Sequence, residues 1–242
     1  MNVHRRALLR VERRLFLRQS LSLGALSLLT GCNLKDDDTI DRLLFAMSRW
    51  NDDVQARLFS PQQLAPTYAP ADVARPFPIN GIYPADDPPI VDADNFRLEL
   101  GGRITDRRPW SLAQLRRLPQ QSQITRHVCI EGWSAIGQWS GVSLRLFLTV
   151  VGADLKARHV SYRCADRYYG SIDMATALHP QTIIALDQDG APLPAGNGAP
   201  IKIRVPTKLG FKNPKHVQQI AVTNDDPGGY WEDQGYNWFS GL

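Results

Sequence analysis

Eight prolines between residues 60 and 94 limit the fold more than any other feature of this 242-residue sequence. Proline fixes φ and has no backbone N–H, so it breaks helices and is excluded from central strands. The eight are Pro61, Pro66, Pro70, Pro76, Pro78, Pro84, Pro88 and Pro89. We predict one long extended segment here, and irregular segments of this length are usually functional or disordered.

Short regular elements are predicted on both sides of that segment. Apolar residues recur at helical spacing over residues 41–59. Beyond residue 95, short alternating runs predict strands at 96–104 with a hairpin turn at Gly101–Gly102, and at 123–130, 158–164, 182–186, 201–205 and 217–222. Short helices are predicted after the caps Ser111 and Ser143, and at 172–178. The predicted fold class is α+β, with mixed β-sheets and short helices.

Residues 1–32 have the features of an export and processing segment. E-R-R-L-F-L-R at residues 12–18 resembles the twin-arginine export signal. The apolar run at 21–29 is too short to span a bilayer. It ends in L-T-G-C, which resembles a bacterial lipobox and implies lipidation of Cys32. The alternative is a short amphipathic helix that packs on the body of the protein.

Together these signals predict a periplasmic protein that is exported in the folded state and is lipid-anchored to a membrane. The twin-arginine route carries folded proteins, so it also indicates a cofactor that is inserted before export. Residues 33–75 are predicted to form a polar tether followed by the N-terminal helix.

The basic charge of the chain belongs to this leader. The formal net charge is +4, but residues 1–31 contain six arginines and a single glutamate, and without them it is −1. We therefore expect no nucleic-acid partner. Hydrophobic residues at 43% and charged residues at 21% are ordinary for a globular protein, and three cysteines are too few for a disulfide scaffold.

Cys129 is the strongest candidate for a chemically active residue, because it ends a predicted strand just before a glycine-containing turn. Arg126 and His127 are expected to favour its thiolate form by charge. Four interpretations are open from the residues alone: a disulfide with Cys164, a buried free thiol, a metal ligand, or a nucleophile. The histidine base of such a nucleophile would be His127, His159 or His179.

Four sequence blocks resemble the molybdopterin-binding core of the sulfite-oxidase-fold family. They begin with R-H-V-C-I-E-G-W-S-A-I-G-Q-W-S-G-V-S-L at 126–144 and Y-Y-G-S-I-D-M-A-T-A-L-H-P-Q-T-I-I-A-L at 168–186. N-G-A-P-I-K-I-R-V-P-T-K-L-G-F-K-N-P-K at 197–215 and the aromatic ending G-Y-W-E-D-Q-G-Y-N-W-F-S-G follow in order. The resemblance covers residues 76–242 and implies a molybdopterin-binding oxidoreductase domain over that range.

The resemblance implies one molybdenum–molybdopterin cofactor per chain, with the Cys129 thiolate as the protein ligand of the metal. A soft thiolate suits that centre, and glycines and lysines at 196–215 suit a phosphate-bearing pterin. Within the family, the methionine-sulfoxide-reductase type is most similar. Its cofactor contacts correspond here to Asn80, Tyr83, Pro84, Cys129, Cys164, Asn197, Lys202, Asn213, Pro214 and Lys215.

Two of these positions differ from that type. Cys164 stands where the type has a threonine, which leaves its contact with the cofactor open. Lys202 stands where an arginine is usual, so the charge is kept but the bidentate fork is lost. Of Trp133, Trp139, Trp231 and Trp238, at least three are expected to pack rather than to line the cleft.

The resemblance further implies oxygen-atom transfer with two electrons, and reduction of a small or protein-bound sulfoxide or N-oxide. No C-x-x-C-H motif is present, so we expect no haem and a separate membrane electron-transfer partner of haem or quinol type. Only 27 residues follow Lys215, so the dimerisation domain of sulfite oxidases is not expected. Two alternatives remain: a non-catalytic lipoprotein binding module with a Cys129–Cys164 disulfide, and a cysteine hydrolase.

Overall fold

The computed structural model describes residues 38–242, and the chain divides after Ser48 into two units. The predictions for the leader, for Cys32 and for the start of the tether lie outside the described residues. Helix α2 (Asp38–Leu58) has the expected position. In the described range no helix combines the length and the apolar character that a membrane span requires.

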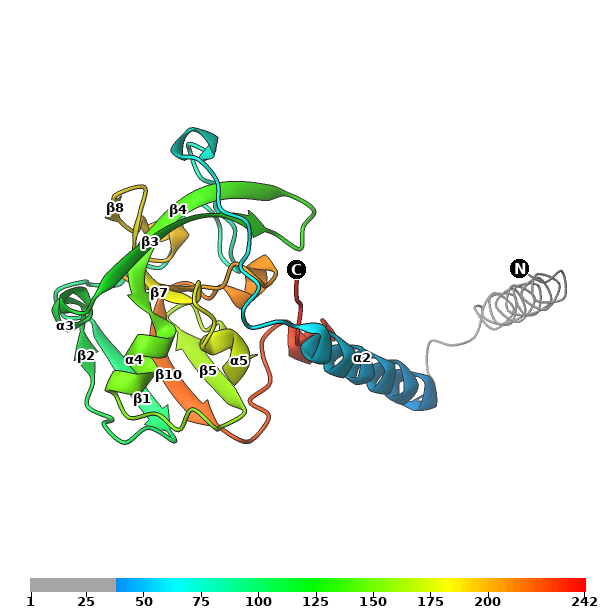
Figure 1. The fold of residues 1–242 in the computed structure, drawn as a ribbon. Coiled ribbons are helices and arrows are strands. Elements are labelled where there is room, and N and C mark those ends of the chain that lie inside the picture. Colours follow the sequence, from blue (N-terminus) through cyan, green and yellow to red (C-terminus); the bar gives the residue numbers. More distant parts are fainter. Residues whose placement is uncertain (1–37) are drawn as a thin grey trace, which may run out of the picture. The chain divides into compact units, whose positions relative to one another are not determined.

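The unit from Arg49 to Leu242 contains two five-stranded sheets with short helices between the strands (Figure 1). The first sheet has the order β2 (Trp110–Ser111), β1 (Arg97–Gly102), β10 (Val217–Thr223), β5 (His159–Cys164), β6 (Tyr169–Asp173). Its β1–β10 pair is parallel and its other pairs are antiparallel. The predicted α+β class with mixed sheets is therefore confirmed.

The second sheet has the order β3 (Gln120–Val128), β4 (Ser134–Ser143), β7 (Ile183–Gln188), β8 (Ala191–Pro192), and β9 (Lys202–Arg204) also pairs with β7. Its long β3–β4 hairpin is curved (Figure 1). Three short α-helices complete the unit: α3 (Leu112–Arg117), α4 (Leu144–Val150) and α5 (Met174–Ala177). Ser111 and Ser143 cap α3 and α4 as predicted.

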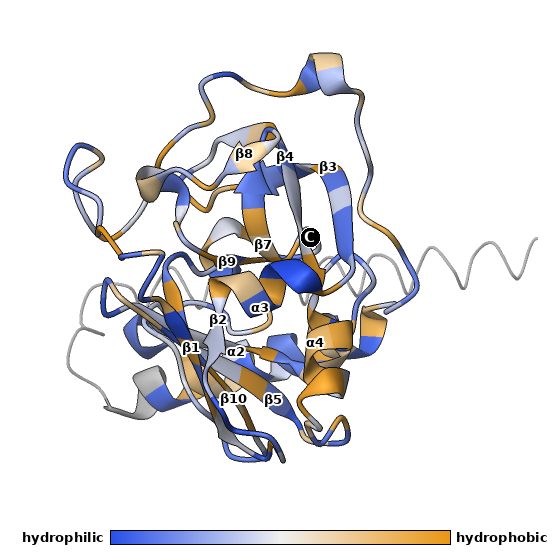
Figure 2. Cartoon of the chain, turned by 90° about the vertical axis from the view of Figure 1, so that its left-hand side faces the viewer, coloured by the Kyte–Doolittle hydropathy of each residue, from blue (hydrophilic) through white to orange (hydrophobic). Residues whose placement is uncertain are grey.

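One apolar core joins the two sheets. It collects the inward side chains of β1, β10, β5 and β6 with those of β4, β7, β9 and α4. Alternation along the strands places apolar side chains on the inward face. In β1, exposed charged residues alternate with buried leucines. Helix α4 is apolar along most of its length and packs on this core (Figure 2).

Two sequence predictions are wrong in detail. No hairpin turn occurs at Gly101–Gly102, because β1 continues through both glycines beside β10, and the chain returns only at β2. The predicted helix at 172–178 begins later. Ile172 and Asp173 end β6, and the Asp173 side chain then caps α5 by accepting a hydrogen bond from Thr176 N.

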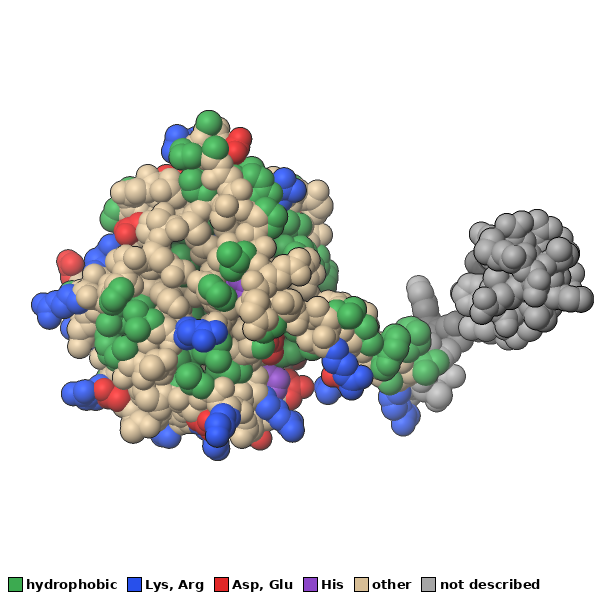
Figure 3. Space-filling view, viewed as in Figure 1, with side chains coloured by type: hydrophobic (Ala, Val, Ile, Leu, Met, Phe, Trp, Pro, Cys, Tyr) green, Lys and Arg blue, Asp and Glu red, His purple; other side chains and the backbone are tan. Residues whose placement is uncertain are grey.

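The segment with the eight prolines is irregular apart from the 3₁₀ helix η1 (Pro70–Asp72). It follows the edge of the second sheet, where Tyr68 N donates to Ile124 O and Ala74 N donates to Ile136 O. The segment is therefore held to β3 and β4 by backbone hydrogen bonds. On the face shown in Figure 3, basic and acidic side chains are scattered and lie mostly near its edges.

Gly141 gives a test of the β4–β7 packing. A Cβ at this position would lie 2.0 Å from the carbonyl oxygen of Ile184 and 2.8 Å from Cα of Ala185. Both are backbone atoms at a bulge in the pairing, so neither can move independently. We expect Gly141→Ala to lower the free energy of unfolding by about 1–3 kcal/mol in urea titrations.

Gly101→Ala is the matched control, because its Cβ would meet Ala221 Cβ at an ordinary 3.4 Å. We expect it to change the free energy of unfolding by less than about 0.5 kcal/mol. Equal effects of the two substitutions would contradict the close β4–β7 approach.

Candidate active site

Cys129 directly follows β3, at the start of the turn into β4. Its N–H donates to Trp133 O, and Gly132, with φ of +92°, closes the turn onto Cys129 O. A positive φ favours glycine, so the motif C-I-E-G-W encodes the turn locally. The thiol is thereby fixed at the end of a rigid hairpin, as the sequence predicts.

Two side chains contact the sulfur of Cys129. Asn80 Nδ2 donates to Sγ at 3.2 Å, and Glu131 Oε2 lies 3.6 Å from Sγ. Glu131 is itself held by a hydrogen bond from Trp133 Nε1 at 2.9 Å. The proline-rich segment thus delivers Asn80 to the cysteine from 49 residues away.

The predicted activation of this thiol by Arg126 and His127 is wrong. Side chains alternate along β3, so Arg126 points to the other face, where its guanidinium lies 5.3 Å from the centre of the Tyr68 ring. His127 does line the pocket, but burial and the cations around it hold its pKa well below the ordinary value. Burial and Glu131 raise the pKa of Cys129.

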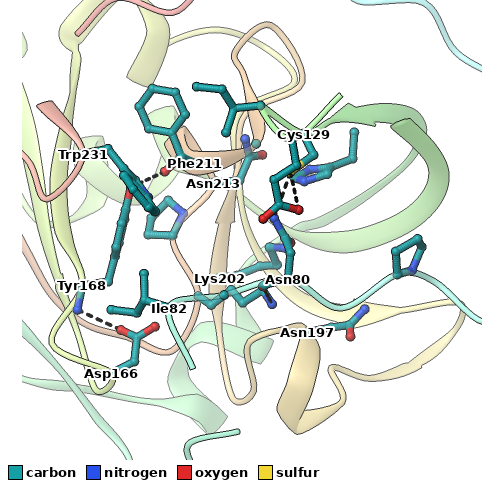
Figure 4. Close-up of a pocket in the computed structure, with 18 of the residues that line it drawn as sticks. Asn80, Ile82, Cys129, Asp166, Tyr168, Asn197, Lys202, Phe211, Asn213 and Trp231 are labelled. Atoms are coloured by element: carbon teal, nitrogen blue, oxygen red, sulfur yellow. Dashed lines mark hydrogen bonds between the residues drawn. The ribbon is translucent and has the colours of Figure 1, made fainter. Parts of the chain in front are cut away.

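A pocket opens in front of Cys129 and brings together residues that are far apart in the sequence (Figure 4). Of the ten predicted site residues, seven line it: Asn80, Cys129, Asn197, Lys202, Asn213, Pro214 and Lys215. They come from the proline-rich segment, the β3–β4 turn, η2 (Ala195–Asn197), β9, and the stretch after η3 (Gly210–Lys212). The predicted clustering is therefore what the fold produces.

Three predicted site residues are not among those lining the pocket. Pro84 is exposed, and Cys164 is buried in the main core. The hydroxyl of Tyr83 lies 3.0 Å from His216 Nε2 and 3.4 Å from Gly196 O, behind the pocket wall. Their contacts with a cofactor stay predictions.

Two predicted site residues have structural contacts as well. Lys215 Nζ donates to Gly196 O at 2.6 Å and to Asn80 O, so it ties the Asn80 segment to η2. Asn213 Oδ1 accepts hydrogen bonds from Arg204 and from Val205 N. Lys215 thus fixes the residue that contacts the Cys129 sulfur.

The polar floor of the pocket is cationic. Lys202, which is 3% exposed, and Lys215 line the pocket, and Arg204, which is fully buried, lies near them outside the lining. Within residues 38–242 none of the three forms an ion pair with a carboxylate. Burial, with repulsion from Lys215 and Arg204, holds the pKa of Lys202 well below its ordinary value. Burial lowers the pKa of Lys215 to about 8.

Several buried polar groups in this region have no protein partner in the described part of the chain. Both ring nitrogens of His127 and Nε of Arg204 are buried without a hydrogen bond. The Lys202 ammonium also has no hydrogen bond to a described residue. Buried polar groups are normally paired, so this floor fits an anionic, hydrogen-bonding ligand.

The donor set fits a molybdenum–pterin cofactor. Cys129 offers one soft thiolate for the metal, and the lysines and backbone groups around Gly210 suit a phosphate and a pterin edge. Gly210 is needed for space, because a Cβ there would lie 2.7 Å from His127 Nε2. Cys129 would bind the metal of such a group, and Lys202 would face its negative charge.

The structure disagrees with both alternative interpretations of Cys129. Cys129 and Cys164 are free, so the predicted alternative of a disulfide-linked binding module is wrong in this structure. The hydrolase alternative needs a histidine that forms a hydrogen bond with the Cys129 thiol. Within the described residues, the side chains that form hydrogen bonds with this thiol are Asn80 and Glu131. His179 instead contacts Gln63 O, and His159 packs on Trp238.

Some lining residues were not among the predicted cofactor contacts, although the sequence analysis named His127 as a candidate base and Trp231 as one of four tryptophans that pack or line the cleft. His127, Asp166, Tyr168, Phe211 and Trp231 all line the pocket. Phe211 and Trp231 belong to segments that the resemblance covered, which is the signal that could have found them. Trp139 instead packs under Arg204, Trp238 donates to Ser171, and Trp133 packs on the His127 ring at 5.8 Å between centroids. None of these three is among the residues that line the pocket, so the expectation that at least three tryptophans pack is confirmed.

A buried ion pair stabilises the wall that carries Phe211 and Trp231. Lys212 Nζ contacts Glu232 Oε1, and their side chains are 1% and 7% exposed. Glu232→Gln leaves the lysine charge buried without its partner. We expect it to lower the free energy of unfolding by about 3–5 kcal/mol in denaturant titrations.

The exposed neighbour Asp233, which accepts a hydrogen bond from Tyr169, provides the control. We expect Asp233→Asn to cost less than about 1 kcal/mol, because exposed polar contacts contribute little. Similar losses for the two variants would show that the buried pair has no special importance.

Comparison with known proteins identifies the family. The protein-family model described as "Oxidoreductase molybdopterin binding domain" matches residues 85–231 of the sequence. The chain belongs to this family. Members of the oxidoreductase molybdopterin binding domain family bind a molybdenum cofactor, which agrees with the donor set around Cys129. Asn80, Tyr83 and Pro84 lie just before the matched range.

Two proteins that are similar to this chain are named as methionine-sulfoxide reductase proteins. A protein of Azospira oryzae, provisionally named protein-methionine-sulfoxide reductase subunit YedZ1, is 58% identical over 229 residues, 95% of this chain and 87% of the relative. The protein-methionine-sulfoxide reductase catalytic subunit MsrP of Campylobacter jejuni is 28% identical over 158 residues, 58% of this chain and 53% of that protein.

A solved structure shows the same fold. The sulfane dehydrogenase SoxCD of Paracoccus pantotrophus superposes with a TM-score of 0.53 at 17% sequence identity, covering 56% of this chain and 40% of that one. The predicted sulfite-oxidase-type molybdopterin-binding fold is therefore confirmed.

Proposed function

We propose that this chain is the catalytic subunit of a molybdopterin-dependent reductase that acts on sulfoxides or related N-oxides. The observation that carries the proposal is the free Cys129 thiol facing a pocket whose buried cations have no carboxylate partners within residues 38–242. The names of the two relatives support sulfoxide reduction over oxidation of sulfite.

The bound cofactor supplies the transfer of one oxygen atom and two electrons. Asn80 orients Cys129 Sγ by its 3.2 Å hydrogen bond, and Lys215 orients Asn80. Lys202 and its neighbouring cations would neutralise the negative charge of the cofactor phosphate. Reduction of a sulfoxide to a sulfide and water also takes up two protons, and the Glu131 carboxyl group, exposed and 3.6 Å from Sγ, is placed to hold one.

The experiment that tests this proposal is a dye-coupled assay of the holoprotein. Reduced viologen dye should be oxidised on addition of methionine sulfoxide, dimethyl sulfoxide or trimethylamine N-oxide, and not without them. Fully molybdenum-loaded protein that oxidises the dye with none of these substrates would contradict the proposal.

We further propose one molybdenum per chain, no haem in the chain, and electrons from a membrane haem or quinol protein. The sequence of the leader supports export in the folded state to the periplasm and lipidation of Cys32. In this scheme residues 1–32 are the signal, residues 33–75 the tether and helix, and residues 76–242 the catalytic domain. Mass spectrometry of the membrane fraction tests it, because a diacylglycerol mass on the mature N-terminus is expected.

A further inference from the structure

The pocket has two sides of different character (Figure 4). The side near Cys129 and Lys202 is polar and holds the buried groups without partners. The opposite side and the rim carry four apolar side chains that are half-buried or exposed, Ile82, Ile130, Phe211 and Trp231, and Asp166 and Tyr168 lie on the same side. A cofactor accounts for the polar side, and it leaves the opposite side without an assigned ligand.

Phe211 and Trp231 are 20 residues apart in the sequence, yet their neighbours hold them together. Lys212 and Glu232, the next residue after each, form the buried ion pair. Tyr236 makes edge contacts with both rings, with centroids at 6.2 Å from Phe211 and 5.3 Å from Trp231. The backbone oxygen of Phe211 also accepts a hydrogen bond from Tyr168 at 2.6 Å. This aromatic wall, Phe211 with Trp231, is therefore preorganised.

We propose that the aromatic wall binds the carbon arms of a neutral sulfoxide and so determines the specificity of the enzyme. This inference rests on the proposed sulfoxide reductase function. A sulfoxide has one polar oxygen and two carbon arms on a partly positive sulfur. Sulfur and alkyl groups pack favourably on aromatic rings. The oxygen then faces the polar side with Cys129, while the arms contact Phe211 and Trp231.

The arrangement predicts that affinity depends on the size of the arms. Methyl phenyl sulfoxide and N-acetylmethionine sulfoxide can cover the wall, whereas the two methyl groups of dimethyl sulfoxide cover little of it. Trp231→Ala should therefore raise KM about tenfold for the two larger substrates and less than twofold for dimethyl sulfoxide, with kcat nearly unchanged. Trp231→Phe should restore most of the affinity, because it keeps an aromatic face.

The assay uses molybdenum-loaded full-length protein, and molybdenum and released pterin are measured for every variant. Trp50→Ala is the matched control, since Trp50 is a 68% exposed tryptophan outside the pocket. It should leave all KM values unchanged. If Trp231→Ala does not fold, Phe211→Leu tests the same wall and should show the same graded rise in KM.

Two results would overturn the inference while leaving the proposed function intact: unchanged KM values in the wall variants, or an equal rise for all three sulfoxides. Absence of sulfoxide reduction by the loaded wild-type protein is a different outcome, seen before any variant is compared. It would overturn the proposed function and this inference with it.

Discussion

Cys129→Ser should abolish reductase activity and deplete the protein of molybdenum. Cys129 is the thiol that faces the pocket, and serine cannot supply a soft thiolate to the metal. Loss of a residue that only supports a metal ligand already costs 10- to 100-fold, so loss of the ligand should cost more than about 100-fold in turnover. Turnover is measured by the dye-coupled assay, and metal per protein by mass spectrometry.

Cys164→Ser is the control for this prediction. Cys164 is also a free buried cysteine, but it packs in the main core and does not line the pocket. The variant should keep its molybdenum and most of its activity, with a modest loss of stability. Equal loss of metal in the two variants would contradict the assignment of Cys129 as the ligand.

Lys202→Met should affect cofactor binding and apoprotein stability in opposite directions. Lys202 is 3% exposed and has no hydrogen bond or ion pair with residues 38–242. Removing its charge should weaken retention of the phosphate-bearing cofactor by about 10- to 100-fold, measured as pterin retained after gel filtration. The apoprotein should become more stable by about 1–4 kcal/mol, because an unpaired buried charge is lost.

The pH dependence follows from the direction of the pKa shift. The pKa of Lys202 in the folded protein lies well below its unfolded value. Between the two values the unfolded chain binds more protons, so the stability contributed by this residue rises with pH and is lowest below the folded pKa. Thermal unfolding of the wild-type apoprotein should therefore gain more from pH 7 to pH 9 than that of Lys202→Met.

Lys156→Met provides the matched control, since Lys156 is exposed and outside the pocket. It should change neither pterin retention nor the pH slope of apoprotein stability. A loss of apoprotein stability in Lys202→Met would contradict the view that its charge is unpaired until a ligand binds.

The sequence predicted strands with one buried face, and it also predicted β7 and β9, which are buried on both faces. Strands β1, β3, β5 and β10 alternate between apolar and polar residues, and each was found within a few residues. Strand β4 was not predicted, because Gly137 and Gly141 interrupt its pattern. The space at these glycines is limited by tertiary neighbours, Phe77 at Gly137 and Ile184 at Gly141, which no local pattern contains.

The candidate site was predicted mainly through the family resemblance. That resemblance located Cys129 and six further lining residues across five segments, and the fold brings them together. It could not show that Arg126 points away from the thiol, which depends on the register of β3. It also could not show that Lys215 and Asn213 have structural contacts, since these depend on the packed positions of η2 and Arg204.

The molybdenum content of the purified full-length protein tests the central claim most directly. The protein should be produced in a host that makes the cofactor and exports folded proteins, and metal and released pterin should be measured on the same sample. We predict close to one molybdenum and one pterin per chain. Well-folded protein from that host with neither molybdenum nor pterin would contradict the assignment of Cys129 and the cationic pocket as a molybdopterin site.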